Sequence, residues 1–241
     1  MNIRSWLVAG LSCLPLALSS GPASASLITL HTRASGAAAA PAGSVASLGS
    51  YYHDTIEAAL AGAPGAGYCD VTLSSFADTS NHGSCSGGSS SNIAFAYKLD
   101  FGLDAAQGGD FSMRLGVDFG KGGAVFLDGQ LLDARNTDLW WAGNWSAGSQ
   151  LFQFSSLALG AGNHELAIYG LEGCCDGGQR GEYRIGANGS WTAFAAGDGL
   201  IFRAAPASVP EPRSLALVLS AMLGLAATRQ LQAARKRKRA D

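Results

Sequence analysis

Residues 111–132 read FSMRLGVDFGKGGAVFLDGQLL, and this stretch decides the fold. In its first half every second residue is apolar, as in a strand with one buried face; these residues are Phe111, Met113, Leu115, Val117 and Phe119. In its second half the dipeptide Asp128-Gly129 stands between apolar flanks, which is the pattern most typical of a two-residue hairpin turn. The stretch therefore predicts antiparallel strands joined by tight turns.

Similar strand-like runs occur on both sides of this stretch. They cover residues 93–101, 151–159, 164–171, 183–194 and 200–203, and the fourth contains Asn188-Gly189 as a second hairpin signal. Between residues 92 and 203 no long amphipathic helix is evident. The pattern predicts an all-β fold, a β-sandwich of the jelly-roll kind over residues 92–204.

The segment before this domain, residues 26–91, is rich in alanine, glycine and serine and shows little periodicity. We expect a loose N-terminal segment with a strand at residues 26–32 and a polar loop at residues 74–91.

The two ends of the chain carry targeting signals. Residues 1–25 have a basic residue, an apolar run and the small-residue cleavage site Ala23-Ser24-Ala25, which predicts a helical secretory signal peptide. At the other end come a linker with Pro210-Glu211-Pro212 (residues 205–213), a hydrophobic helix (214–234) and a basic cytoplasmic tail (235–241). The uninterrupted apolar run, residues 214–228, is shorter than the roughly 20 residues of a full span. Such a tail is typical of a cleaved sorting signal.

This C-terminal arrangement resembles the PEP-CTERM sorting signal of Gram-negative bacteria. The resemblance implies an exosortase as partner, membrane contact through residues 214–234 before processing, and passage through the inner membrane to the cell surface or extracellular matrix. Residues 92–203 further resemble the CCXG group of PEP-CTERM proteins, whose Cys-Cys-x-Gly element matches Cys174-Cys175-Asp176-Gly177. That group implies a location and no activity. At the level of fold alone, the Asp-Gly hairpin and the GNHELAIYG strand resemble carbohydrate-binding jelly rolls of the protective-antigen and galactose-binding type.

Charge and cysteine content follow from export. The full chain has a formal charge of −2, whereas residues 26–212 hold eight basic and 17 acidic residues, a balance of −9 that argues against nucleic acid as a partner. An oxidising compartment favours disulfides. Once the signal peptide is removed, Cys69, Cys85, Cys174 and Cys175 allow three pairings. We expect a local Cys69–Cys85 bond, which forces a vicinal Cys174–Cys175 bond; the two pairings between distant cysteines stay open.

The candidate ligand-binding residues cluster in two places. Trp140, Trp141 and Trp145 lie in DLWWAGNW, where exposed rings would stack on sugars and buried ones would close the core. Asp138 and Asp176 stand beside this group and the Cys-Cys element. We expect no cofactor and no metal site, and the sequence has no EF-hand loop; calcium is the one alternative. Its candidate ligands are Asp118, Asp133, Asp138, Glu172 and Asp176.

The sequence has no G-x-S-x-G or HExxH motif, so we expect no enzyme. The favoured function is an exported surface or matrix protein that contacts exopolysaccharide. The alternatives are a secreted polysaccharide hydrolase, which needs two carboxylates in an open groove, and a purely structural or adhesive surface protein.

Overall fold

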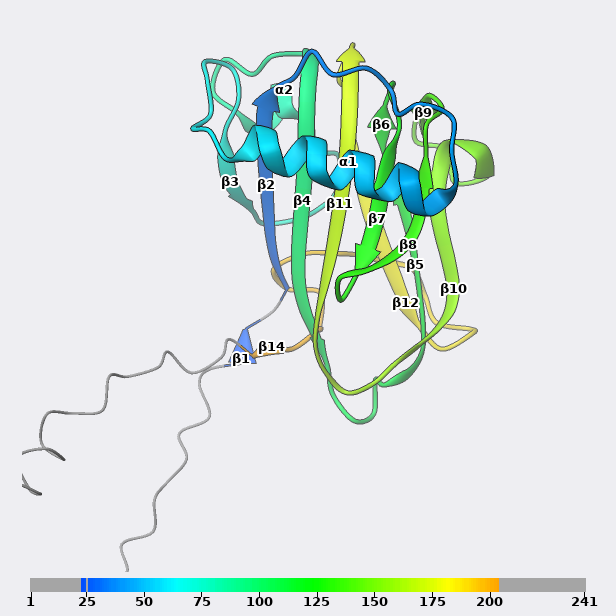
Figure 1. Cartoon of the computed structure of the whole chain (residues 1–241). Coiled ribbons are helices and arrows are strands. Elements are labelled where there is room, and N and C mark those ends of the chain that lie inside the picture. The colour runs from blue at the N-terminus through cyan, green and yellow to red at the C-terminus, as the bar shows by residue number, and fades with distance from the viewer. Residues whose placement is uncertain (1–22, 25, 204–241) are drawn as a thin grey trace, which may run out of the picture. The chain divides into compact units, whose positions relative to one another are not determined.

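The computed structural model describes residues 23, 24 and 26–203, and it consists of two facing antiparallel sheets with a helix outside the larger one (Figure 1). The larger sheet has the order β3 (Asp70–Leu73), β2 (Leu27–Ala34), β4 (Ser91–Leu103), β11 (Gly162–Cys174), β7 (Gly123–Leu127), β8 (Gln130–Arg135). The smaller sheet has the order β10 (Leu151–Leu159), β5 (Gly109–Gly116), β12 (Arg180–Ile185), β13 (Thr192–Ala193). Two short pairs complete it, β6 (Asp118–Phe119) with β9 (Leu139–Trp140) and β1 (Ala23–Ser24) with β14 (Phe202–Arg203). The predicted all-β sandwich is confirmed.

The main core lies between the two sheets. All five alternating apolar residues of 111–119 are fully buried, as predicted. They meet the inward residues of β4, which include Phe95, Tyr97, Leu99 and Phe101. Burying one side chain of this size stabilises the fold by about 2 kcal/mol, so the alternation is sufficient to fix which face of each strand points inward.

The predicted hairpin at Asp128-Gly129 is confirmed. Leu127 pairs with Gln130, and the two residues between them have φ values of +50° and +74°, the left-handed pair that a two-residue turn requires. The second hairpin also exists, because β12 pairs with β13. Its connection is longer than predicted: it begins at Gly186, with φ +73°, and Asn188-Gly189 lies inside the loop.

Residues 26–91 are not loose, and this corrects both that expectation and the domain boundary at residue 92. Strand β2 pairs with β4 along its whole length, and helix α1 (Val45–Leu60) crosses the outer face of the larger sheet (Figure 1). Leu48, Tyr52 and Ile56 recur every four residues and are buried, which gives α1 one apolar face. They form a second core against small side chains of the sheet, among them Ala94, Ala96, Ala124 and Ala167. The amphipathic pattern of this helix is weak in the sequence, because it rests on only three large residues in a segment rich in alanine, glycine and serine.

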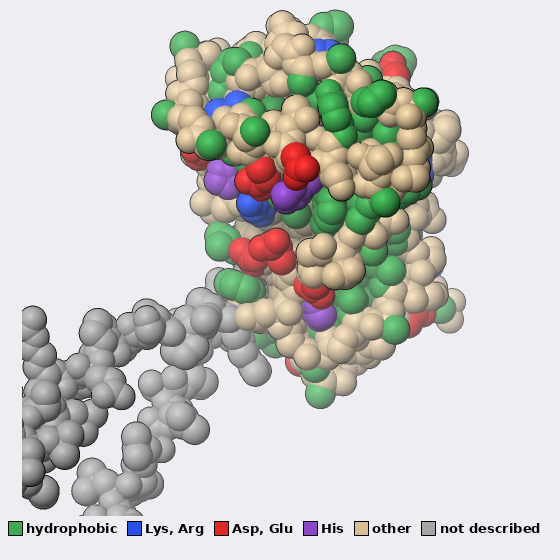
Figure 2. Space-filling view, viewed as in Figure 1, with side chains coloured by type: hydrophobic (Ala, Val, Ile, Leu, Met, Phe, Trp, Pro, Cys, Tyr) green, Lys and Arg blue, Asp and Glu red, His purple; other side chains and the backbone are tan. Residues whose placement is uncertain are grey.

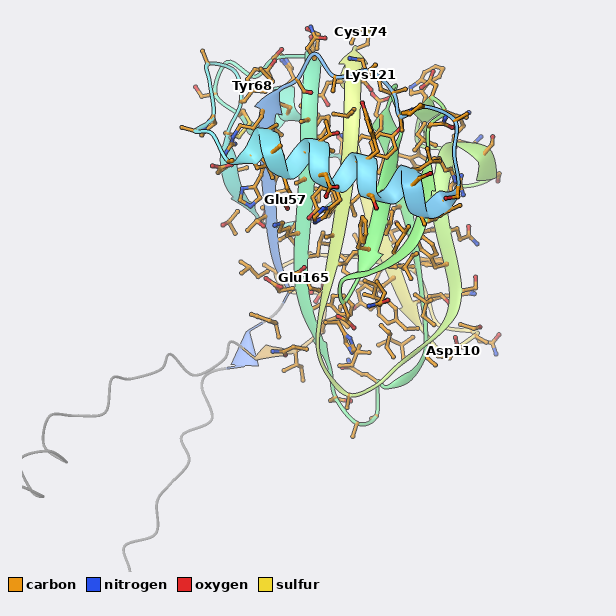
Figure 3. The ribbon with its side chains drawn as sticks, viewed as in Figure 1. Glu57, Tyr68, Asp110, Lys121, Glu165 and Cys174 are labelled. Carbon is orange, nitrogen blue, oxygen red and sulfur yellow. A yellow bond between two sulfur atoms is a disulfide. The ribbon has the colours of Figure 1, made fainter. Side chains whose placement is uncertain are left out.

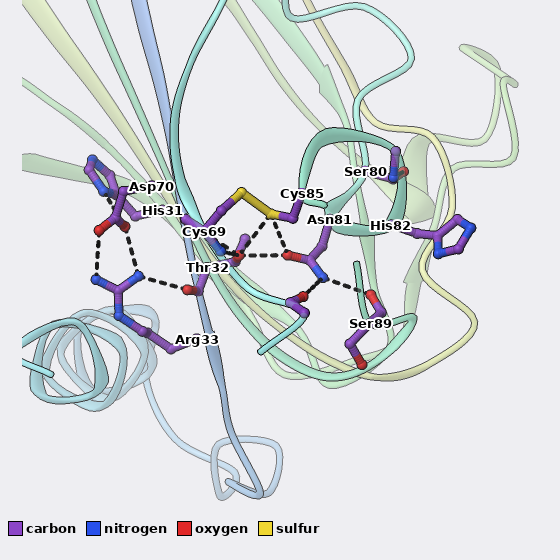
Figure 4. The surroundings of a disulfide bond; sticks show 12 residues. His31, Thr32, Arg33, Cys69, Asp70, Ser80, Asn81, His82, Cys85 and Ser89 are labelled. Carbon is purple, nitrogen blue, oxygen red and sulfur yellow. Dashed lines mark hydrogen bonds and ion pairs between the residues drawn. A yellow bond between two sulfur atoms is a disulfide. The ribbon is translucent and has the colours of Figure 1, made fainter. Parts of the chain in front are cut away.

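The polar loop at residues 74–91 is also ordered, around the Cys69–Cys85 disulfide, which confirms the predicted local bond (Figure 4). The segment contains the short helix α2 (Asn81–Ser84). Fully buried Asn81 accepts a hydrogen bond from Thr32 Oγ1 at 2.6 Å and donates to the carbonyls of Gly67 and Ser89. A buried amide with all these partners is a strong local constraint, so the disulfide and Asn81 together tie this segment to β2.

The predicted targeting signals at the two ends of the chain fall on residues whose placement the structure does not describe. The signal peptide apart from Ala23 and Ser24, the Pro210-Glu211-Pro212 linker, the hydrophobic segment 214–234 and the tail 235–241 lie outside the described residues. Within residues 26–203 no helix has the length and apolarity needed to cross a membrane.

Candidate functional site

Two adjoining hollows lie at the end of the sandwich where β11 finishes at Cys174 (Figure 3 labels Cys174 and Lys121 at this end). Their volumes are about 510 and 460 Å³, and Asp118 and Trp140 line both. The first hollow is also lined by Gly120, Lys121, Asp138, Glu172, Gly173, Cys174 and Cys175. The second is also lined by Asp78, Trp141, Ala142, Gly143, Gly177, Gly178 and Arg180. The predicted tryptophan and Cys-Cys elements therefore lie at one edge of the molecule.

The pairing of β6 with β9 joins the two hollows. Asp118 and Trp140 are direct partners in this pair, so their side chains share a face. Just beyond it, the backbone N–H of Trp141 donates to Val117 O at 3.1 Å. Asp118 is flanked in the chain by two fully buried core residues, Val117 and Phe119, and these fix its register. The alternation that was read as a core pattern therefore also positions this carboxylate.

Three carboxylates at this end anchor the surrounding loops, and the two that are buried, Asp118 and Glu172, line the first hollow and form its floor. Asp118, which is 8% exposed, accepts a hydrogen bond from the N–H of Gly177. Glu172, which is 3% exposed, accepts from the N–H groups of Gly120 and Cys174. Asp176 accepts from the N–H of His82 at 2.8 Å. Each carboxylate therefore fastens a different backbone segment to the rim.

Two of these three carboxyl groups, Asp118 and Asp176, have raised pKa values. Burial, opposed in part by the hydrogen bond from Gly177 and assisted by the neighbouring charges of Glu172, Asp176 and Asp138, raises the pKa of Asp118 to about 6. Burial likewise raises the pKa of Asp176 to about 6. Several acids that share one partly dehydrated site disfavour each other's charge. Asp118 and Asp176 therefore hold protons at a mildly acidic pH at which isolated carboxyl groups are ionised.

The structure divides the three predicted tryptophans. Trp140 is 64% exposed and lines both hollows. Trp141 is 7% exposed; it covers Gly116 so closely that a Cβ there would overlap its ring, and it lines the second hollow. Trp145 lines neither hollow, because it packs on Trp141 with ring centroids 4.5 Å apart. Trp140 alone has the exposed face expected of a sugar-stacking ring.

Trp145 belongs to a different cluster, on the outer face of the smaller sheet. The guanidinium of Arg114 lies between two indoles, 4.1 Å from the centroid of Trp145 and 4.4 Å from that of Trp191. The same guanidinium pairs with buried Glu182. The guanidinium of Arg184 also stacks on Trp191, 4.8 Å from the centroid of its ring. The Trp145–Arg114–Trp191 stack is a structural unit that the sequence analysis missed, because its members are remote in the chain.

The vicinal bond expected between Cys174 and Cys175 is not closed in this structure. Cys174 and Cys175 are exposed free thiols that line the first hollow. Their sulfur atoms lie 2.7 Å apart. Adjacent Cα atoms stand about 3.8 Å apart across a trans peptide, shorter than the usual span of a disulfide, so closing the bond requires a further local adjustment of the backbone.

The predicted calcium ligands are also divided. Asp118, Asp138 and Glu172 line the first hollow. Asp176 lines neither hollow, although its charge acts on Asp118, and Asp133 lies on β8, where it pairs with Arg135 at 2.9 Å. Among residues 26–203, no three or more His, Cys, Asp or Glu side chains are grouped as a metal site requires. Lys121 and Arg180 add cationic groups to the rim that the sequence had not singled out. The arrangement offers a flat aromatic face, carboxylate acceptors and two cations.

A third hollow of about 280 Å³ lies where α1 meets the larger sheet. Figure 2 shows acidic and histidine side chains on this face. Glu57 of α1 pairs with Lys98 at 3.1 Å and accepts from Tyr169 Oη at 2.7 Å, while His53 contacts Asp54 at 2.8 Å. The contacts of Glu57 with Lys98 and Tyr169 fasten the helix to the sheet, whereas the His53–Asp54 contact lies within the helix.

No protein-family model matches this chain, and no curated protein matches its sequence. Solved structures with similar folds include the PA14 sugar-binding domain of an RTX adhesin, with 15% identity, a TM-score of 0.44 and coverage of 75% of this chain and 99% of that one. The PA14 domain of the antifreeze protein MpAFP gives 8%, 0.43, 83% and 100% for the same quantities. The A domain of epithelial adhesin 9 from Candida glabrata, solved in complex with Galβ1-4GlcNAc, gives 8%, 0.46, 79% and 95%.

Proposed function

We propose that this protein is a non-enzymatic, exported surface or matrix protein that binds polysaccharide in the paired hollows around Asp118 and Trp140. The observation that carries the proposal is a single exposed indole set above buried carboxylates in the same hollow. A sugar ring has an apolar face that packs on an indole, and it has hydroxyl groups that donate to carboxylate oxygens. The first hollow has the volume of an ordinary small-ligand pocket.

The energetics of the floor support a binding role. A charged carboxylate that is buried with raised pKa destabilises the fold at neutral pH, and such groups concentrate at functional sites. Asp118 also retains lone pairs after accepting one backbone hydrogen bond, because a carboxylate has about four acceptor positions. The hollow therefore keeps acceptor capacity for a ligand hydroxyl.

Binding is favoured over hydrolysis of the same polysaccharide. A glycosidase needs one protonated carboxyl and a second carboxylate that is free to act as a nucleophile or base. Asp118 has a pKa suited to the first role. Of the other two acids that line the first hollow, Glu172 is not free for the second role, because both its oxygens accept backbone N–H groups, and Asp138 is exposed to solvent. A purely architectural role is disfavoured because Trp140 stays exposed beside an open hollow.

Export and sorting complete the proposal. The order of Pro210-Glu211-Pro212, a short apolar segment and a basic tail supports recognition by an exosortase and release to the cell surface or matrix. Deleting residues 205–241 should abolish surface delivery in a host with this sorting system. Delivery unchanged by the deletion would refute this part.

The binding part is tested on a glycan array and on purified exopolysaccharide, with and without calcium. Trp140→Ala should weaken binding by about tenfold, since an aromatic contact contributes roughly 0.5–1.5 kcal/mol beyond its buried area. Trp145→Ala is the matched control and should leave binding unchanged. The proposal would be refuted if the unaltered protein bound no glycan both with and without calcium.

A further inference from the structure

The two adjacent thiols in the first hollow are held unusually close. The sulfur atoms of Cys174 and Cys175 are separated by 2.7 Å. Unbonded heavy atoms prefer about 3.5–4.0 Å, whereas a disulfide measures about 2.05 Å. Both side chains are exposed to the hollow. The pair is therefore accessible to a reagent and is already directed sulfur to sulfur.

The backbone on both sides holds the thiols in this position. Cys174 ends β11, opposite Ser91, and its N–H donates to Glu172 Oε1 at 2.8 Å. On the other side, the N–H of Asp176 donates to Ser90 O at 3.1 Å. Between these anchors Cys175 has φ +73°, a left-handed conformation that non-glycine residues seldom adopt. A residue held in this way at a cavity rim indicates a functional constraint.

We propose that Cys174 and Cys175 form a site of reversible oxidation, which closes to a vicinal disulfide and so changes part of the wall of the Asp118–Trp140 hollow. The co-reactant is a small-molecule disulfide such as glutathione disulfide. One cysteine thiolate attacks a sulfur of the reagent, forming a mixed disulfide and releasing one glutathione thiolate. The second cysteine then attacks the mixed disulfide at the protein sulfur, which releases the other glutathione thiolate. Two protein thiols and one disulfide become one protein disulfide and two thiols, with the two protons passing to the leaving thiolates.

Either cysteine can make the first attack, because both thiols are exposed to the hollow. The hydrogen bond and the charge of Cys175 raise the pKa of the Cys174 thiol, and the charges of Glu172 and Asp118 act in the same direction. Because the two thiols interact directly, loss of a proton from one disfavours loss from the other, so the pair reacts as one thiolate and one thiol. The Cys69–Cys85 bond has a different role: it ties separate segments together, and neither of its cysteines lines either hollow.

The chemistry is tested by mass spectrometry on the full chain after mild reduction and exposure to glutathione disulfide. The fifth cysteine, Cys13 of the predicted signal peptide, is replaced by serine (Cys13→Ser) so that it cannot take part. The expected product has lost two hydrogen atoms, carries no glutathione, and yields peptides with Cys174 joined to Cys175. Cys174→Ser, which lacks the resolving thiol, should retain glutathione on Cys175. Stable glutathione adducts on the unaltered pair, or a peptide joining either cysteine to Cys69 or Cys85, would overturn the proposal.

Two further measurements test the effect on the hollow. Trp140 lines it together with both cysteines, so oxidation should change the tryptophan emission, and Trp140→Phe should abolish most of that change. Emission that oxidation leaves unaltered would overturn the inferred change of the wall. The second measurement rests on the proposed function: polysaccharide affinity should change by roughly threefold or more between the reduced and oxidised forms, because closing the ring alters preorganisation. Equal, measurable affinity would refute the coupling while leaving the function intact; no affinity in either form would instead refute the proposed function.

Discussion

Trp140 and Trp145 lie close together in the sequence and belong to regions with opposite properties. Trp140 faces solvent over a floor of carboxylates, with its ring largely uncovered. Trp145 packs on Arg114 and on Trp141, so its ring is already partnered. The difference lies in what satisfies the ring: protein groups in the Trp145–Arg114–Trp191 stack, and an external ligand in the proposed hollow. Substitutions in the stack should therefore change stability, and substitutions at the hollow should change binding.

The largest loss of stability is expected from Arg114→Ala. This change removes the cation between two indoles and leaves buried Glu182 with Arg180 as its remaining ionic partner. We expect the free energy of unfolding to fall by about 3 kcal/mol, because buried Glu182 loses one of its two cationic partners and both indoles lose the cation stacked on them. Urea denaturation measures it. The matched control is Arg184→Ala, which removes only a stacking cation from Trp191 and should lower stability by less than about 1 kcal/mol. Equal losses from the two variants would contradict the role given to the Arg114–Glu182 pair.

Asp118→Asn should act in the opposite direction, by about 2 kcal/mol at pH 7. The folded-state pKa of Asp118, about 6, lies above the ordinary value of about 4, so the folded protein binds more protons between these pH values. The free energy of unfolding of the unaltered protein therefore falls as pH rises through this window, and the penalty is complete above it. Asparagine lacks the charge and can still accept the Gly177 N–H. The gain should be present at pH 7 and vanish near pH 4.

The same measurement separates stability from binding. Asp176→Asn should stabilise in the same direction, because burial raises its pKa to a similar value. If Asp118 accepts a ligand hydroxyl, Asp118→Asn should also weaken polysaccharide binding while it stabilises the fold. A variant that is less stable than the unaltered protein at pH 7 would refute the raised pKa.

Sequence periodicity was sufficient for the sandwich because alternation decides which face of a strand is buried. The run from Phe111 to Phe119 and the Asp128-Gly129 turn both carry local signals, and both proved correct. Helix α1 was missed because its apolar face packs on alanines of the sheet, and a face that needs only three large side chains is weak in sequence. The sequence also could not show that β2 occupies the interior of the larger sheet, since strand order depends on contacts between distant segments.

The site was partly predictable for a related reason. Trp140, Asp138 and the Cys-Cys element were identified from residue type and loop position, and they do meet at one edge. Asp118 looked like one acid among several, although the core residues on either side of it hold it at the centre of the floor. The separation of Trp145 from Trp140 depends on Arg114 and Trp191, which the fold brings from other strands and loops. Residue type therefore indicated the chemistry, and the packing of each ring decided its role.

The smallest stability effect is expected at Trp140, and it gives the sharpest test of the comparison. Trp140→Ala should change the free energy of unfolding by less than about 0.5 kcal/mol, because a largely exposed ring contributes little to the core. Trp145→Ala should cost roughly 1–2 kcal/mol through its lost contacts with Arg114 and Trp141. Denaturation and polysaccharide binding measured on both variants should give crossed results: stability lost in one, affinity lost in the other. If both variants lost stability equally, Trp140 would be a packing residue, and the hollow beneath it would no longer need an external ligand to explain its exposed ring.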